Sequence, residues 1–70
     1  MRLYVGDGVT YRAELFRVAP NTFRKLEKEG HGYIVDKVSD DLFYVFNGVR
    51  NCLVSRMDIM INHHTKETRD

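Results

Sequence analysis

The Asn47-Gly48 dipeptide, with an apolar run on each side, constrains the fold of this chain more than any other feature. Both runs lie within Leu42–Val54. Asn-Gly between two such runs is the strongest short-range signal for a β-hairpin, because a two-residue type I′ turn needs positive φ at both central residues, which these two tolerate. We therefore predict a hairpin in which Phe46 lies directly opposite Val49.

Alternation along this hairpin separates its side chains into two faces, and both are largely apolar. The first face contains Phe43, Val45, Cys52 and Val54, and the second contains Leu42, Tyr44, Phe46, Val49 and Leu53. A sheet with one solvated face shows one polar face, so both faces need cover, either within the domain or from a partner. The second face is therefore a candidate protein-binding surface. Cover by Phe23 and Leu26, from elsewhere in the chain, is the alternative.

The length and charge of the chain limit the function classes open to it. Seventy residues make one small domain, which buries only about 60% of the surface that its unfolded chain exposes. A two-lobed enzyme with a deep cleft is excluded at this size. The formal net charge of +1 neither indicates nor excludes a nucleic-acid partner.

Cysteine usage and hydropathy indicate the compartment. Cys52 is the only cysteine, so an intramolecular disulfide cannot form and a reducing cytoplasm is the expected location. No stretch has the apolar run of a signal peptide or of a bilayer-spanning helix, so we expect no membrane partner.

The segments outside the hairpin predict short strands separated by turns. Residues 9–15 alternate apolar and polar side chains as a half-buried strand does. Phe16 and Val18 then reverse the parity, which predicts a bulge or bend near residues 15 and 16. Further strands are predicted over residues 3–5, 33–38 and 59–61, with a single 3₁₀ turn over residues 55–58 and a polar tail over residues 62–70.

Residues 22–29 predict one or two turns of helix. Phe23 and Leu26 stand three apart among charged residues, and Gly30 follows as a terminator. A helix this short is not stable alone, so its two apolar residues would have to dock on the rest of the domain. A long irregular loop anchored by the same two residues is the alternative.

The order of these elements resembles a small barrel of the Src-homology 3 (SH3)-like class over roughly residues 3–61. Gly30–Val35 looks like the glycine-led second strand of KOW-type and other translation-protein barrels. Cys52–Ile59 is similar to the strand, 3₁₀ turn and strand that close such barrels. The resemblance implies a mostly β fold: a single small five-stranded SH3-like barrel over residues 1–61, with a long excursion after the first strand and the tail beyond it.

The resemblance also implies some functions and argues against another. KOW-type modules typically bind RNA or protein through loops. Peptide-binding SH3 domains usually present a tryptophan and paired tyrosines to proline-rich ligands. This chain contains no tryptophan, so that activity is not expected here.

Basic side chains interleaved with aromatic ones form a second candidate surface. The basic and aromatic members are Tyr11, Arg12, Arg17, Arg24, Lys25 and Lys28, with Phe16 and Phe23 between them. Cations neutralise phosphates and aromatic rings stack on bases, so this mixture suits single-stranded RNA or DNA. The alternative is an ordinary solvated face whose acidic neighbours Glu27 and Glu29 offset the lysines, with the aromatic rings in the core.

No residue pattern predicts catalysis, a cofactor or a metal site. The glycine pairs at residues 6–8 and 30–32 lack the further glycines and the long helix of a nucleotide-binding loop. His63 and His64 are adjacent, so on a strand they would point apart, and a third metal ligand would have to come from His31, Asp58 or a second copy of the chain. Solvated histidines of a polar tail are the better interpretation. Cys52 lies on a face expected to be buried, so it predicts packing and not nucleophilic chemistry.

The sequence therefore predicts a non-enzymatic interaction module. Its first expected role is a protein-binding adaptor or regulator that uses the second hairpin face to bind a protein partner or a second copy of itself. Its alternative role is a nucleic-acid-binding accessory protein that uses the cluster between Arg12 and Lys28.

Overall fold

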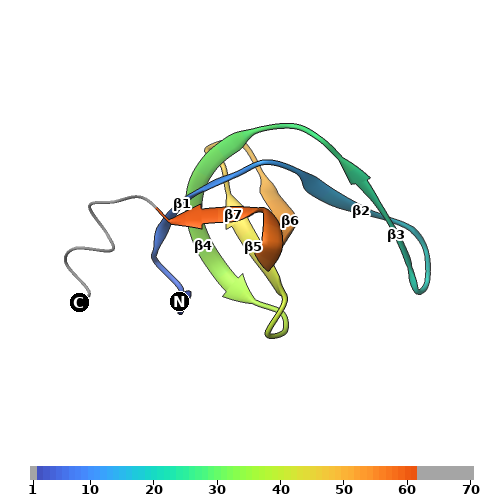
Figure 1. Cartoon of the computed structure of the whole chain (residues 1–70), viewed down its shortest axis with the longest axis horizontal. Coiled ribbons are helices and arrows are strands. Elements are labelled where there is room, and N and C mark those ends of the chain that lie inside the picture. The colour runs from blue at the N-terminus through green and yellow to red at the C-terminus, as the bar shows by residue number, and fades with distance from the viewer. Residues whose placement is uncertain (1, 62–70) are drawn as a thin grey trace.

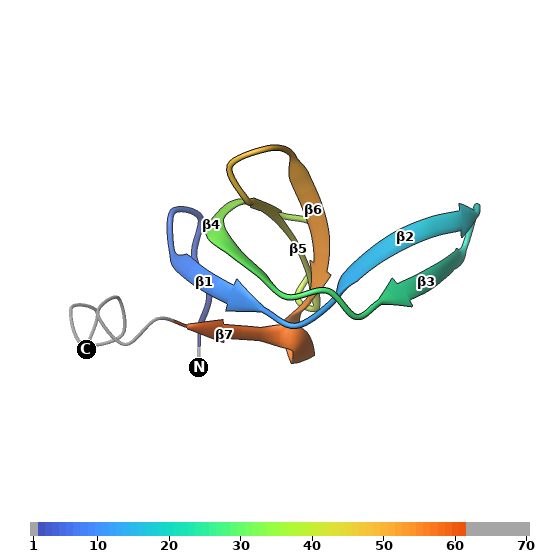
Figure 2. The ribbon, with the colours of Figure 1, turned by 90° about the horizontal axis from the view of Figure 1, so that it is seen from above.

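The computed structural model describes residues 2–61, and they form one antiparallel sheet of seven strands. The elements are β1 (Gly8–Tyr11), β2 (Glu14–Ala19), β3 (Thr22–Leu26), β4 (Gly30–Lys37), β5 (Leu42–Phe46), β6 (Asn51–Ser55), the 3₁₀ turn η1 (Arg56–Asp58) and β7 (Ile59–Ile61). The strand order is β3-β2-β6-β5-β4-β1-β7. The sheet curls into a half-barrel, from which β2 and β3 project as a separate hairpin (Figures 1 and 2).

The mostly β class is confirmed, whereas the predicted count of five strands is wrong. The structure has seven because the long excursion after β1 is itself a pair of strands. The 3₁₀ turn and the short strand after it lie where the sequence predicts them. The polar tail of residues 62–70 and the adjacent histidines His63 and His64 lie outside the described residues. Within residues 2–61, no helix is long and apolar enough to cross a membrane.

The interior of the half-barrel is filled by the first face of the β5–β6 hairpin, as predicted. Phe43, Val45, Cys52 and Val54 are at most 1% exposed. Leu3, Val9, Tyr11, Ile34 and Ile59 complete the apolar cluster. Burying one large apolar side chain contributes roughly 1.5–3 kcal/mol, so this cluster is what holds the sheet in its curled form.

The loop between β5 and β6 differs from the predicted two-residue turn. Phe46 lies opposite Asn51, so the loop has four residues and the register is displaced by two. Among the described residues only glycines have positive φ, so Gly48, at 98°, has it and Asn47 does not. The Asn47 side chain stabilises the longer loop, since its Oδ1 accepts hydrogen bonds from the N–H groups of Val49 and its successor at 2.9 and 3.0 Å. A displacement of two residues keeps each strand side chain on its predicted face.

Residues 22–26 form a strand, so the helix predicted over residues 22–29 is wrong. β3 pairs with β2 along its whole length. A single helical turn fixes several residues for few hydrogen bonds, whereas β2 offers a ladder of backbone partners. Phe23 and Leu26 are 37% and 47% exposed, so they do not dock on the domain as a helix would require.

The bend in the first long strand is also displaced from its predicted place. Residues 12 and 13 belong to no strand, and they divide β1, which pairs with β4 and β7, from β2, which pairs with β3 and β6. The change of parity after Leu15 is accompanied by a register shift between Arg17 and Ala19. The strand predicted over residues 3–5 does not form, because a turn at Gly6 (φ 99°) follows at once and leads the chain into β1.

Candidate functional site

The hairpin of β2 and β3, which we call the arm (residues 14–26), is the most exposed element of the molecule. It extends away from the half-barrel in both views (Figures 1 and 2). Every residue of β3 is exposed, and so are the last four residues of β2. One bridge, Leu15 opposite Leu53, pairs the arm with β6. The arm therefore presents both of its faces to solvent.

Two cross-strand pairs on the arm place an arginine opposite a phenylalanine. Phe16 lies opposite Arg24 on one face, and Arg17 lies opposite Phe23 on the other. The Arg17 Cζ atom is 5.4 Å from the centroid of the Phe23 ring, which is a cation–π distance. Phe16 and Phe23 are 39% and 37% exposed, so neither ring is buried in the core. Each face of the arm thus offers an aromatic ring beside a guanidinium group.

The charge of the arm is entirely positive beyond its first residue. Residues 15–26 contain three basic and no acidic side chains. Large apolar side chains are exposed on the same hairpin, including Val18 at 58% and Leu26 at 47%. A surface that combines positive charge with accessible apolar groups suits an anionic partner that also carries flat apolar faces.

The structure divides the predicted basic cluster into separate groups. Arg17 and Arg24 lie on the arm, and Lys28 is exposed in the segment that joins β3 to β4. Tyr11 is 1% exposed, so its ring is part of the core and has no surface on which a base could stack. Arg12 and Lys25 are turned toward a carboxylate of η1.

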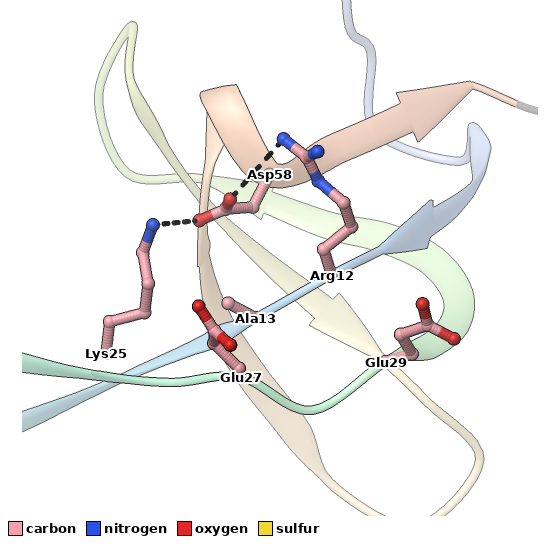
Figure 3. Close-up of a pocket in the computed structure, with 6 residues that line it drawn as sticks. All are labelled: Arg12, Ala13, Lys25, Glu27, Glu29 and Asp58. Atoms are coloured by element: carbon pink, nitrogen blue, oxygen red, sulfur yellow. Dashed lines mark ion pairs between the residues drawn. The ribbon is translucent and has the colours of Figure 1, made fainter.

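That carboxylate, Asp58, forms the centre of a hollow at the base of the arm. Its side chain is 7% exposed and lies 3.8 Å from the Arg12 Nη2 atom and 3.3 Å from the Lys25 Nζ atom (Figure 3). The hollow has a volume of about 520 Å³ and is also lined by Glu27 and Glu29. Acidic and basic groups are mixed here, so the hollow has no strong preference for an anion. Within the part of the chain that the structure describes, no three His, Cys, Asp or Glu side chains are grouped to hold a metal ion.

A buried polar network at the base of the arm was not expected from the sequence. The Glu14 carboxylate is 1% exposed, and its Oε1 atom lies 2.7 Å from the Arg50 Nη2 atom. The Tyr11 hydroxyl donates to Glu14 Oε2 at 3.3 Å. The Asn47 amide donates to the Tyr11 hydroxyl at 3.4 Å and to Cys52 Sγ at 3.3 Å. The network connects the first residue of β2 to the loop between β5 and β6.

The network sets the protonation states of its members. Burial raises the pKa of Tyr11 to about 12 and also raises the pKa of the Cys52 thiol. Burial opposes the charged form of Glu14 as well, but the hydrogen bond and charge of Arg50 outweigh it and lower the pKa of Glu14. The raised pKa favours the thiol form of Cys52, and the lowered pKa favours an ionised Glu14 carboxylate whose charge Arg50 compensates. This arrangement stabilises the fold and does not activate a nucleophile.

The second face of the β5–β6 hairpin is only partly covered. Tyr44 is 38% exposed, whereas Leu42, Phe46 and Leu53 are half-buried. Val49 is 84% exposed, but it lies in the loop and not on the strand face.

An aromatic neighbour on β4 extends this face. Tyr33 lies opposite Phe46, and their ring centroids are 5.8 Å apart. Tyr33 is 48% exposed. The predicted protein-binding residues, apart from Val49, are thus brought together on one face, with Tyr33 added by the topology.

Comparisons with protein-family models, with curated proteins and with solved structures give no match.

Proposed function

We propose that the protein is a non-enzymatic SH3-like barrel that binds single-stranded nucleic acid through its arm. The observation that carries this proposal is the pair of exposed Phe–Arg couples, Phe16 with Arg24 and Arg17 with Phe23, on opposite faces of a hairpin that lacks acidic residues beyond Glu14. Guanidinium groups neutralise phosphates, and the adjacent rings stack on bases.

The element order supports the SH3-like part of the proposal. The excursion after β1 occupies the place expected in the SH3-like outline, and β4, β5 and β6 form the three-stranded meander that follows it. The turn η1 then interrupts the chain, and β7 returns to pair with β1. These connections are compatible with a small barrel whose last strand is interrupted by a 3₁₀ turn.

Single strands suit this arm better than duplexes. Aromatic side chains reach only the faces of unstacked bases, and each such stack contributes about 1–3 kcal/mol. Two rings on opposite faces of a narrow hairpin can engage two bases of a strand that bends around it. The free, buried thiol of Cys52 supports a reducing compartment such as the cytoplasm for this activity.

Fluorescence anisotropy of labelled single-stranded RNA and DNA, titrated with the full chain over a range of salt concentrations, tests the proposal. We expect binding at low salt that weakens steeply as salt rises. Arg17→Glu and Arg24→Glu should each weaken it about tenfold or more, because each replaces a phosphate contact with repulsion. Absence of binding to either nucleic acid at low salt contradicts the proposal.

Lys37→Glu is the matched control for these variants. It makes the same charge change on β4, where Lys37 forms an ion pair with the exposed Asp40 at 3.5 Å and with no other residue between 2 and 61. Its affinity should stay close to that of the wild type apart from the small effect of net charge. A loss as large as that of Arg24→Glu would show that overall charge, and not the arm, governs binding.

Protein binding through the second hairpin face is a second candidate function. The observation that favours it is the exposure of Tyr33 and Tyr44 on either side of the half-buried Phe46. Tyr44→Ala or Phe46→Ala should then abolish association while the domain stays folded, and unchanged association would rule this function out.

A further inference from the structure

One row of five side chains crosses five neighbouring strands on the outer face of the sheet. Its members, in order across the sheet, are Lys25, Leu15, Leu53, Tyr44 and Asp36. Residues that lie directly opposite one another project from the same face. With strands about 4.8 Å apart, the row is about 19 Å long. A cation occupies one end, a carboxylate occupies the other, and the three central side chains are apolar or aromatic.

We propose that this row is the interface of a two-fold symmetric homodimer. A two-fold axis through Leu53 brings Lys25 of one copy against Asp36 of the second, and Leu15 against Tyr44. Each contact then occurs twice, as an isologous interface requires. A row with opposite charges at its two ends and apolar groups between them is complementary to itself in this arrangement, which is why the occupant is a second copy and not a different protein.

The charges at the two ends of the row are accessible. Asp36 is exposed, and its carboxylate makes no ion pair with any residue between 2 and 61. The Lys25 side chain is 43% exposed although its Nζ atom also reaches Asp58. Charges at the rim of an interface set its register, whereas its buried centre supplies most of the affinity.

The centre of the row has apolar surface to bury. Tyr44 is 38% exposed, and Leu15 and Leu53 are half-buried. Tyr33 and Phe46, whose rings lie 5.8 Å apart, stand one row farther along the same strands. Burial of these five side chains removes a contiguous apolar patch from water.

Pairing of the free β3 edges is a less favourable route to a dimer. β3 ends the sheet, but antiparallel pairing of two copies of Thr22–Leu26 would bring together the arginines and lysines at residues 24 and 25. Basic residues on an edge strand oppose such pairing. The outer face therefore remains the better surface for a second copy.

The dimer goes beyond the proposed nucleic-acid binding and does not depend on it. The Phe16–Arg24 pair lies on the opposite face of the arm from the row, and Arg17 and Phe23 lie farther out toward its tip. The dimer would present two arms on one particle, which raises avidity for a long strand.

Light scattering coupled to a sizing column, run without nucleic acid over a range of concentrations, tests the inference on the full chain. We expect a dimer for the wild type. Asp36→Lys should raise its dissociation constant about tenfold or more, because like charges then meet at both ends of the row. Asp41→Lys, the same charge change in an exposed loop beside β5, is the matched control and should remain dimeric.

Mixing the two single charge reversals gives the sharpest test. Asp36→Lys and Lys25→Glu should each dimerise more weakly than the wild type, whereas an equimolar mixture should form a heterodimer in preference to either homodimer, since opposite charges face each other at both ends. Native mass spectrometry identifies that species.

Circular dichroism checks that each variant is folded, since Lys25→Glu also places a carboxylate near Asp58. If Lys25→Glu does not fold, the light-scattering measurement is made with Tyr44→Ala in place of the mixing test. Tyr44→Ala should be a folded monomer. A wild-type monomer at all concentrations overturns the inference. A dimer that survives both Asp36→Lys and Tyr44→Ala overturns it as well.

Discussion

Glu14 is the residue on which the base of the arm depends. Its buried carboxylate meets the guanidinium of Arg50, which lies 36 residues later in the chain. Transfer of an isolated ion out of water costs several kcal/mol, so the carboxylate is stable there only while Arg50 and the Tyr11 hydroxyl remain beside it. The sequence shows Glu14 as an ordinary polar position of an alternating strand. Nothing local could reveal its burial, because both the loop that carries Arg50 and the register of that loop are set by tertiary structure.

Glu14→Gln should destabilise the protein by about 1–3 kcal/mol at neutral pH, because Arg50 loses its counter-charge. Urea unfolding measures the difference. Arg50 outweighs the effect of burial and holds the folded pKa of Glu14 below its ordinary value of 4.5. The stabilisation is therefore fully present above that pH and is lost as the pH falls through the lower folded pKa.

The advantage of the wild type over Glu14→Gln should consequently shrink in strongly acid solution. Glu29→Gln, which changes an exposed carboxylate, is the matched control and should have little effect at either pH. An advantage of the wild type that is the same in neutral and strongly acid solution would contradict this account of the network.

At the scale of elements, side-chain periodicity predicted the two faces of the β5–β6 hairpin correctly but not the second strand of the arm. The two faces of β5 and β6 could be predicted because side chains alternate with a period of two and the core needs one apolar face. The strand over residues 22–26 could not be predicted, because the spacing of three between Phe23 and Leu26 places them on one face of a helix but on opposite faces of a strand, and it therefore favours a helix. The choice is made by β2, which supplies the backbone partners. The length of the β5–β6 loop could not be predicted either, because it depends on the hydrogen bonds that the Asn47 side chain accepts from the N–H groups of Val49 and Arg50.

The rings and the guanidinium groups of the arm should make separable contributions to nucleic-acid binding. Phe16→Leu and Phe23→Leu remove stacking but keep apolar volume on exposed positions, so they should lower affinity about fivefold or more without changing its salt dependence. Arg17→Ala and Arg24→Ala should lower affinity and also reduce the slope of log affinity against log salt by about one each. Anisotropy titrations at several salt concentrations distinguish the two effects. If the phenylalanine variants bind as the wild type does, the rings have no part in recognition.

At the scale of the whole molecule, the arm contributes no residue to the apolar core and pairs with the half-barrel through a single bridge. The cluster of buried apolar residues includes members from β1, β4, β5, β6 and β7 but none from residues 15–29. The arm is held to the half-barrel by the bridge between Leu15 and Leu53, the Glu14 network and the ion pair of Lys25 with Asp58. A hairpin with so little apolar cover has low stability of its own. Its order is therefore expected to depend on those few attachments.

Amide hydrogen exchange should show whether the arm is less stable than the half-barrel. We expect the amides of β3 to exchange through local opening of the arm, at rates insensitive to low concentrations of urea. The amides of β5 and β6 should exchange only through global unfolding, because the core packs on them, so their rates should rise with urea. Exchange of the wild type followed by NMR or mass spectrometry gives both sets of rates. Single-stranded nucleic acid should slow exchange in β2 and β3, and not in β5 and β6, if the arm is its binding site. Equal protection and equal urea dependence in β3 and β5 would show instead that the arm unfolds only together with the half-barrel.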